Sequence, residues 1–334
     1  MTPHDMNRYG YFKVAAAVPA VRVADCGFNA DHITGLMRRA AARGVRVMVF
    51  PELCITAYTC GDLFLQPKLL DAAAAALDRI AAASRDIHVA AIVGAPLRYG
   101  NAIYNCAVVM AGGKYLGAIP KSYIPNYAEF YEARWFASGA EIKDAHITIG
   151  ECEVPFGTDL QMVIDGVRCG VEICEDLWAP VTPSTGLCLA GATVIANLSA
   201  SNELIGKDDY RRLLVSSASS RLICGYVYAN AGHGESTQDM VFSGHSLIYE
   251  NGQLLAEKKP FAKNGLIATE IDLFRLRFER HRNTSFDESS APECRRVYFS
   301  QELRDTELTR HIARRPFVPA DGEILAERAE AILS

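Results

Sequence analysis

The sequence has no excess of positive charge. Its 334 residues hold 34 Lys and Arg against 39 Asp and Glu, which gives a formal net charge of -5. Nucleic acids and anionic membrane surfaces call for a basic patch, so we expect neither as the main partner. The sequence also has no apolar run near the roughly 20 residues that a membrane-spanning helix needs. We therefore expect a globular chain that needs neither nucleic acid nor membrane.

A secretion signal is missing as well. The first residues include Asp5, Arg8 and Lys13 and lead into a short apolar run that Pro19 interrupts, which is not the pattern of a signal peptide. We therefore expect a cytoplasmic location. The ten cysteines form no Cys-x-x-Cys pair and have no histidine at a metal-ligand spacing. Most of them are expected to be buried free thiols, and no metal site is predicted.

Other catalytic signatures are absent too. The sequence has no Gly-x-Ser-x-Gly motif, which disfavours a serine hydrolase of that type. Gly232-His233-Gly234 is not a dinucleotide-binding fingerprint. A Cys-His hydrolase would need His233 or His245, and the sequence offers no third orienting group near either.

Three apolar, strand-like runs each end on a residue suited to catalysis. These are Glu52 after residues 45–51, Lys121 after residues 114–120, and Cys174 after residues 167–173. Active sites of α/β proteins collect at strand ends, where the sheet holds polar groups rigidly at one edge. A base, a cation and a thiol are together the components of acyl transfer through a covalent intermediate.

Strand-like and helix-like segments alternate before residue 290. Strands are expected at 13–18, 45–50, 89–95, 103–111, 114–120, 162–173, 193–198, 224–230, 241–250 and 265–271, and helices at 29–43, 68–85 and 208–223. Gly44 is suited to ending the first helix, and Gly112-Gly113 and Asn251-Gly252 favour tight hairpins. Alternation mixed with hairpins predicts an α/β domain with mixed sheets, in one layer or two.

Beyond residue 290 the pattern changes. Residues 289–292 are typical of a break in regular structure. Asp321 is a suitable N-cap for a helix over 322–333, whose apolar residues share one face. That helix has little to pack on within this sequence.

Longer motifs surround the three strand ends. They are Phe50-Pro51-Glu52-Leu53, residues 120–127, residues 129–132, residues 172–178 and residues 197–202. In this order, across residues 10–290, they resemble the glutaminase domain of glutamine-dependent NAD synthetase, within the nitrilase superfamily, where catalysis uses Glu, Lys and Cys. The resemblance implies a nitrilase-like α-β-β-α sandwich of two stacked mixed sheets with outer helices.

The chemistry that these residues offer follows from their types. Cys174 is the predicted nucleophile, and a thiol is weak while it is protonated. Glu52 is therefore expected to act as its base, a role that typically contributes about 10²–10⁴-fold in rate. Lys121 is expected to hold the oxyanion of the tetrahedral intermediate. A second glutamate would orient Lys121, with Glu132 as the first choice and Glu129 as the alternative.

The resemblance implies glutamine as the substrate, and glutamine carries two charged groups besides its amide. Its α-ammonium suits Glu175, and its α-carboxylate suits Lys207 and Ser201. By resemblance, Tyr127, Ser201 and Lys207 match glutamine-binding positions. Some members have arginine in place of Lys207, which grips a carboxylate differently. Three aromatic residues are expected to complete the pocket through hydrogen bonds or an apolar wall, namely Tyr58, Tyr127 and Trp178.

The resemblance further implies an enzyme that supplies ammonia to an ATP-dependent NAD synthetase domain, which amidates deamido-NAD. The Ser-Gly-Gly-x-Asp-Ser phosphate loop of that domain is absent from the sequence. We therefore predict a truncated chain, with residues 1–290 as the glutaminase domain and residues 291–334 as a linker and first helix leading toward the synthetase domain. ATP and Mg are expected only in that other domain, no cofactor is expected in this one, and the assembly is expected to be a homo-oligomer.

Two alternative interpretations remain. The first is a stand-alone amidase or N-carbamoyl hydrolase of the same superfamily with another substrate. Glu175 and Lys207 disfavour it, because an amino-acid substrate needs both charges and many other amides do not. The second is a non-catalytic docking domain, which would have no use for a complete set of base, cation and thiol.

Overall fold

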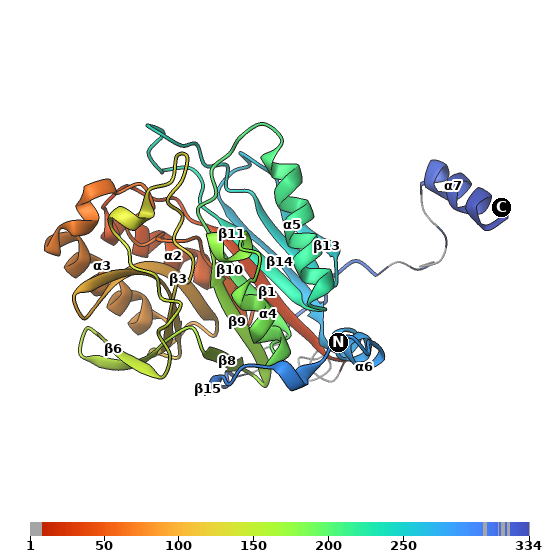
Figure 1. Ribbon diagram of the computed structural model, residues 1–334, viewed down its shortest axis with the longest axis horizontal. Coiled ribbons are helices and arrows are strands. Elements are labelled where there is room, and N and C mark those ends of the chain that lie inside the picture. Colours follow the sequence, from red (N-terminus) through yellow and green to blue (C-terminus); the bar gives the residue numbers. More distant parts are fainter. Residues whose placement is uncertain (1–8, 303–305, 313, 315–317, 319–320, 334) are drawn as a thin grey trace.

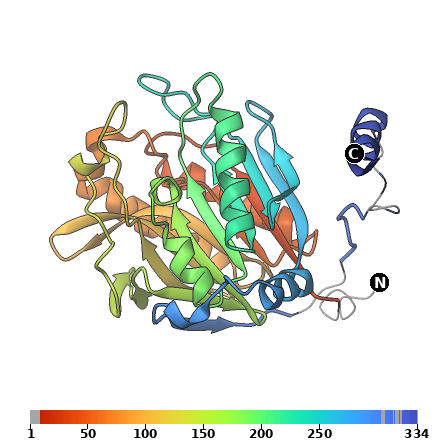
Figure 2. The same cartoon turned by 45° about the vertical axis from the view of Figure 1, so that its right-hand side comes forward.

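Two β-sheets stack face to face with helices on their outer sides (Figures 1 and 2). The computed structural model describes residues 9–302, 306–312, 314, 318 and 321–333. From edge to edge, the first sheet contains β14 (Gly265–Asp272), β1 (Tyr11–Val18), β2 (Val47–Val49), β3 (Ala90–Tyr99), β4 (Ala102–Ala111), β5 (Lys114–Pro120), β7 (Cys152–Phe156) and β6 (Ala145–Ile149). The second contains β13 (Gln253–Lys258), β12 (Ser246–Glu250), β11 (Gly225–Asn230), β10 (Val194–Ser199), β9 (Val167–Ile173), β8 (Leu160–Ile164) and β15 (Arg295–Phe299).

Both sheets mix strand directions. In the first sheet β1 pairs in parallel with β2, whereas β3 and β4 are antiparallel. In the second, β10 is parallel to β11, and β11 is antiparallel to β12. The helices are α2 (Cys26–Ala41), α3 (Pro67–Ala83), α4 (Pro183–Leu189), α5 (Lys207–Arg221), α6 (Leu273–Arg282) and α7 (Gly322–Leu333). The predicted α-β-β-α sandwich of two mixed sheets is confirmed.

The core has one layer between the sheets and one layer under each set of helices. Along β1, Val14 and Ala16 face the space between the sheets, whereas Ala15 and Ala17 face the side that α2 and α3 cover. Side chains of a strand alternate in this way, so a strand buried on both faces has a continuous apolar sequence. On the second sheet, α4 and α5 cover the outer face. Both sheets are thus held rigidly enough to position groups at their ends.

Most elements lie within a few residues of their predicted bounds, with instructive differences. Residues 162–173 form no single strand, because Asp165 and Gly166 turn the chain with φ of 53° and 83° and separate β8 from β9. The strand expected from residue 241 begins only at Ser246. The sequence pattern does not predict β6 and β7, because these short strands at the sheet edge carry exposed polar residues.

The folded layers extend past residue 290. β15 pairs in parallel with β8 at the edge of the second sheet. Further along, the backbone N–H of Thr309 donates to Glu270 at 3.0 Å, and Arg310 Nη2 donates to Glu250 at 2.8 Å. The boundary predicted after residue 290 therefore does not separate the sandwich from a linker. A five-residue edge strand is too short for its pattern to show in the sequence.

The C-terminal helix begins where the sequence predicts. Asp321 Oδ1 accepts the backbone N–H of Glu323 at 2.8 Å, and α7 follows. Every described residue of α7 is exposed, and both views show the helix clear of the sandwich (Figures 1 and 2). Parts of the predicted linker, among them residues 303–305 and 315–317, lie outside the described residues. Among the helices that are described, none is both long enough and apolar enough to cross a membrane.

Candidate active site

The three residues predicted at strand ends lie close together, although they follow strands of two different sheets. Glu52 follows β2 and Lys121 follows β5 in the first sheet, whereas Cys174 follows β9 in the second. Lys121 Nζ donates to Glu52 Oε1 at 2.6 Å, and both side chains are 0% exposed. Cys174 is 6% exposed, and both charged groups are close enough to shift the pKa of its thiol. The structure thus gathers a carboxylate, an ammonium and a thiol in one buried cluster.

Lys121 lies between two carboxylates. Glu132, which begins a 3-10 turn at Glu132–Arg134, accepts from Lys121 Nζ at 2.8 and 2.9 Å. The Tyr58 hydroxyl donates to the same carboxylate at 2.8 Å. Burial alone would lower the pKa of Lys121, but Glu132 and Glu52 outweigh it and hold that pKa well above its usual value. Lys121 is therefore an ammonium ion whose three donors are all engaged.

Two further donors fix the Glu52 carboxylate. Asn105, in β4, donates from Nδ2 to Oε1 at 2.6 Å. The backbone N–H of Ala200, just after β10, donates to Oε2 at 2.9 Å. Neither Asn105 nor Ala200 is among the residues predicted from the sequence. Asn105 could have been noticed in the sequence, because it is a polar residue directly before the apolar run 106–111. Ala200 could not, because its contribution is a backbone N–H that does not depend on the residue type.

Cys174 occupies a strained turn between β9 and the 3-10 helix Cys174–Leu177. Its φ is 46°, in the left-handed region that residues other than glycine rarely adopt. Asp176 fixes this turn, because its carboxylate accepts the backbone N–H of Ile173 at 2.9 Å and that of Tyr123 at 2.8 Å. The turn presents the thiol toward the cluster and is tied to the segment that follows Lys121.

The surroundings of Cys174 favour the protonated thiol. Burial is the largest cause of its raised pKa, Glu52 raises it further, and Lys121 opposes both only in part. The two acidic residues that follow the cysteine point elsewhere, since Asp176 bonds to backbone N–H groups and Glu175 accepts from a tyrosine hydroxyl. Among the nearby carboxylates, Glu52 has the largest effect on the pKa of this thiol.

More exposed residues surround the buried cluster. The Tyr127 hydroxyl donates to the two oxygens of Glu175 at 2.9 and 3.0 Å, and Tyr127 is 56% exposed. Burial raises the pKa of Glu175, while the hydrogen bond from Tyr127 lowers it. A carboxylate accepts more than one hydrogen bond at each oxygen, so Glu175 retains acceptor capacity beyond its bonds from Tyr127.

A second cation near the cluster is the ammonium of Lys207, which lies close to two aromatic rings. Lys207 begins α5, and its Nζ donates to Asn202 Oδ1. The rings of Phe130 and Trp178 lie 5.6 and 5.5 Å from that ammonium. Burial lowers the pKa of Lys207. Trp178 also stacks on Tyr210 with ring centroids 5.3 Å apart, so it packs against the helix as well as against the cation.

The remaining candidate residues have varied surroundings. Ser201 is buried, just after the backbone N–H that bonds Glu52. Glu129 accepts from Asn202 and takes no part in the contacts of Lys121. Tyr58 lies inside the cluster, with its hydroxyl on the second glutamate. Within the described residues, no group of three or more His, Cys, Asp or Glu is placed to hold a metal ion.

Comparison with known proteins identifies the family. Residues 13–280 match the model of the family described as carbon-nitrogen hydrolase. The chain belongs to the carbon-nitrogen hydrolase family. The buried cluster holds a thiol, a carboxylate and an ammonium, the group types from which a nucleophile, a proton-transfer group and an oxyanion donor can be built.

Similar carbon-nitrogen hydrolase segments occur in longer proteins. The chain is 42% identical over 339 residues to the glutamine-dependent NAD(+) synthetase of Mycobacterium tuberculosis (strain ATCC 25618 / H37Rv) and 31% identical over 228 residues to that of Aquifex aeolicus (strain VF5). These alignments cover 98% and 68% of this chain but 50% and 36% of the relatives. The chain thus spans half or less of the length of these curated relatives.

Solved structures show the same fold. A glutamine-dependent NAD(+) synthetase from Cytophaga hutchinsonii matches with a TM-score of 0.71 at 30% identity, over 78% of this chain and 43% of that one. A nitrilase-superfamily amidase from Nesterenkonia AN1, in a C145A mutant, matches with a TM-score of 0.63 at 22% identity, over 83% of this chain and 98% of that one. The second likeness shows that the sandwich of this carbon-nitrogen hydrolase is nitrilase-like.

Proposed function

We propose that the chain hydrolyses the side-chain amide of glutamine through a thioester on Cys174. The observation that carries this proposal is the contact of Lys121 with two buried carboxylates, next to a thiol in a strained turn. A nucleophile, a base and an oxyanion donor are then within reach of one amide group. Similarity to glutamine-dependent NAD(+) synthetases supports glutamine as the source of that amide.

The proposed reaction has two halves. Glu52 takes the thiol proton as the sulphur of Cys174 attacks the amide carbon, and the carbonyl oxygen becomes an oxyanion. When the C–N bond breaks, Glu52 returns the proton to the nitrogen, which leaves as ammonia. Water then attacks the thioester and gives a proton to Glu52, the C–S bond breaks, and the thiolate takes that proton back as glutamate leaves.

Lys121 would stabilise the oxyanion. Its three donors are already used, two of them on Glu132, so one of these two bonds would shift to the oxyanion as charge develops. Glu132 thereby keeps Lys121 charged and correctly oriented before the reaction begins. Loss of one oxyanion donor typically costs roughly 3–4 kcal/mol of transition-state stabilisation.

Charged groups near the cluster fit the two ends of glutamine. Glu175, held by Tyr127, suits the α-ammonium, and Lys207 with Ser201 suits the α-carboxylate. Trp178 forms the apolar wall beside Lys207. An amide without these two charges would offer no oppositely charged group to Glu175 or Lys207, which disfavours a general amidase.

The ammonia would be used by a synthetase. Similarity to NAD(+) synthetases of greater length supports delivery to an ATP-dependent domain that amidates deamido-NAD. ATP and Mg would bind in that domain, with no cofactor in this one. A cytoplasmic location and a homo-oligomeric assembly belong to the same proposal.

Labelling with an electrophilic glutamine analogue tests the proposal. Intact-mass measurement should show a single adduct, peptide mapping should place it on Cys174, and excess glutamine should suppress it. Cys174→Ala should be folded, because one small buried side chain changes, and should neither take up the label nor release ammonia. Protection by simple amides but not by glutamine would contradict the proposal in favour of a stand-alone amidase.

A further inference from the structure

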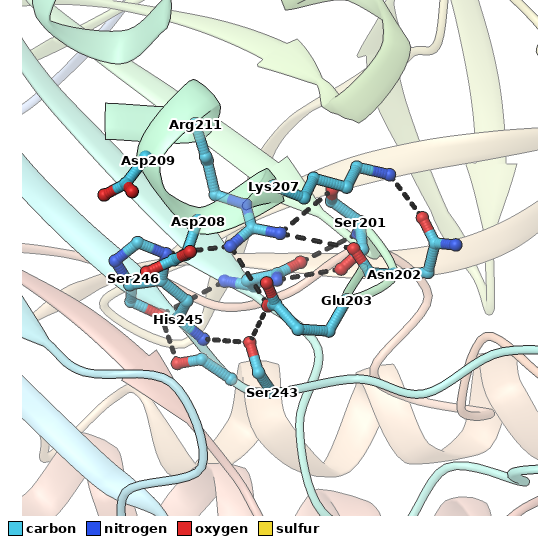
Figure 3. A network of polar contacts seen from close by, with 12 residues as sticks. Ser201, Asn202, Glu203, Lys207, Asp208, Asp209, Arg211, Ser243, His245 and Ser246 are labelled. Atoms are coloured by element: carbon cyan, nitrogen blue, oxygen red, sulfur yellow. Dashed lines mark hydrogen bonds and ion pairs between the residues drawn. The ribbon is translucent and has the colours of Figure 1, made fainter. Parts of the chain in front are cut away.

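One fully buried arginine holds the loop that carries part of the proposed carboxylate site. Arg211, in α5, is 0% exposed, and Figure 3 shows its guanidinium at the centre of a polar network. Its Nη2 donates to Ser201 Oγ at 3.4 Å and to the Asn202 carbonyl at 3.3 Å. Its Nη1 lies 3.2 Å from Glu203 Oε2. Three consecutive loop residues therefore meet one cation that lies beneath the surface.

The same loop positions Lys207. Asn202 Oδ1 accepts from Lys207 Nζ, while its Nδ2 donates to Glu129. Asn202 is thus held by Arg211 through its carbonyl and holds Lys207 through its side chain (Figure 3). The Ser201 hydroxyl bonds to the same guanidinium. A shift of Arg211 would therefore change the spacing between the two groups proposed for the α-carboxylate.

His245 holds Arg211 from the other side. A guanidinium can only donate, so His245 Nδ1 accepts from Arg211 Nη1 at 2.8 Å. The ring proton of neutral His245 is then on Nε2, which donates to Glu257 at 2.9 Å. Glu257 is also paired with Arg212 at 2.8 Å. A second proton on His245 would place an N–H against the guanidinium.

We propose that Arg211 is a positioning residue for the α-carboxylate end of glutamine, and that neutral His245 keeps it in place; this rests on the proposed function. Stability alone is a poor reason for the arrangement. Within the described residues, Arg211 Nε is buried without a hydrogen-bond partner. A buried cation with an unpaired N–H is costly compared with an apolar side chain, so the network points to a geometric task.

The position of Arg211 should depend on pH. The charged groups around His245 are Arg211, Arg212 and Asp208 of α5, Glu203 of the preceding loop, and Glu257 of β13. Burial lowers the pKa of His245, Glu257 opposes this, and the two arginines add to it. His245 therefore stays neutral near neutral pH, and acid that protonates it should raise the KM for glutamine.

Arg211→Lys tests the inference in the purified full chain. Lysine keeps the charge but cannot reach three loop residues at once. We expect KM for glutamine to rise at least about 10-fold with kcat within about 2-fold, because a group that only positions the substrate affects binding. Alkylation of Cys174 by iodoacetamide, which has no α-carboxylate, should keep its rate. Arg221→Lys, at an exposed position in the same helix, is the control and should change neither KM, nor kcat, nor the alkylation rate.

A pair of His245 variants answers the same question if Arg211→Lys fails to fold. Asparagine can place its amide oxygen near the position of Nδ1, whereas glutamine reaches the position of Nε2. His245→Asn should keep the KM of the wild type at neutral pH and remove the rise in KM that the wild type shows on acidification below the usual histidine pKa of about 6.5. His245→Gln should raise KM at every pH.

Each outcome decides the inference. An unchanged KM in both Arg211→Lys and His245→Gln would overturn it while leaving glutamine hydrolysis intact. Equal losses in kcat and kcat/KM, or a changed alkylation rate, would also overturn it and assign Arg211 to the environment of Cys174. A wild-type chain that is alkylated at Cys174 but releases no ammonia from glutamine would overturn the proposed function, and this inference with it.

Discussion

The carboxylate of Asp176 accepts the backbone N–H of Tyr123 at 2.8 Å, from one sheet of the sandwich to the other. Asp176 lies just after Cys174, and Tyr123 lies just after Lys121, so this hydrogen bond joins the turns that carry the thiol and the ammonium. The other carboxylate oxygen accepts the backbone N–H of Ile173 at 2.9 Å. The separation between thiol and ammonium therefore depends on an acid that bonds to the backbone.

Asp176→Asn should lower kcat far more than it changes KM. The amide replaces one acceptor oxygen with an NH₂ group, which cannot accept from a backbone N–H. The unfolding free energy should also fall by roughly 1–3 kcal/mol, the cost of leaving a buried donor unpaired. Steady-state ammonia release and urea unfolding measure both effects. The exposed Asp86, changed to Asn, is the control, and a normal kcat in Asp176→Asn would remove the coupling role.

Glu132 should make the unfolding free energy depend on pH. Burial raises its pKa to about 7, although Lys121 opposes this, so between its usual pKa and that value the folded state binds more protons than the unfolded state. Its stabilising contribution is complete below the usual pKa and is lost as pH rises through about 7. Urea unfolding at roughly pH 5 and pH 7.5 should show a gap between wild type and Glu132→Gln that changes with pH.

The more exposed Glu129→Gln is the matched control for that measurement. The difference in unfolding free energy between Glu129→Gln and the wild type should be the same at both pH values. If the difference between Glu132→Gln and the wild type were also independent of pH, the raised pKa of Glu132 would be wrong.

Lys207→Ala should raise the KM for glutamine and leave kcat nearly unchanged. A charge-assisted hydrogen bond contributes roughly 1.5–3 kcal/mol, which corresponds to about 10–100-fold in KM. The loss would be in binding, because the proposed place of Lys207 is beside the substrate carboxylate and not beside the amide. The exposed Lys114, changed to Ala, should leave both constants unaltered. A fall in kcat alone would assign Lys207 a catalytic or structural role.

Arg310→Ala should destabilise the fold strongly. Arg310 is 11% exposed and pairs with Glu250, which is 0% exposed, so its loss leaves a buried carboxylate without its main partner. The expected cost is about 3–5 kcal/mol of unfolding free energy. Arg275 contacts the same Glu250 at 3.5 Å but is 42% exposed, and Arg275→Ala should cost less than about 1 kcal/mol. Equal effects in urea unfolding would contradict the difference in burial.

The residue pattern predicts mixed α/β sheets and the meeting of three side chains for a clear physical reason, whereas the stacking of two sheets is implied only by the resemblance to the nitrilase superfamily. Glu52, Lys121 and Cys174 each follow a buried apolar strand, and the sheet determines where a strand ends. The choice between Glu132 and Glu129 cannot be made in this way. Both lie in an irregular loop, where no period tells which side chain turns back toward Lys121.

Buried charges are the part that the sequence does not reveal. Arg211 and Arg212 are adjacent in α5, yet the first is fully buried and the second is partly exposed. A helix beginning Lys-Asp-Asp-Tyr-Arg-Arg is typical of a solvated face, so the pattern alone does not separate them. The role of Asp176 is not visible in the sequence for another reason, because its partners are backbone N–H groups, one of its own turn and one of the distant turn at Tyr123.

The parallel pairing of β15 with β8 also bears on how a chain of this kind can be shortened. All five residues of β8 are buried, and β15 covers its outer hydrogen-bonding groups. A chain cut at residue 290 would leave the largely apolar strand β8 unpaired on one side, at the edge of the second sheet. Such a strand is a template for pairing with another copy, so the shortened chain should be prone to aggregation even where its catalytic cluster is complete.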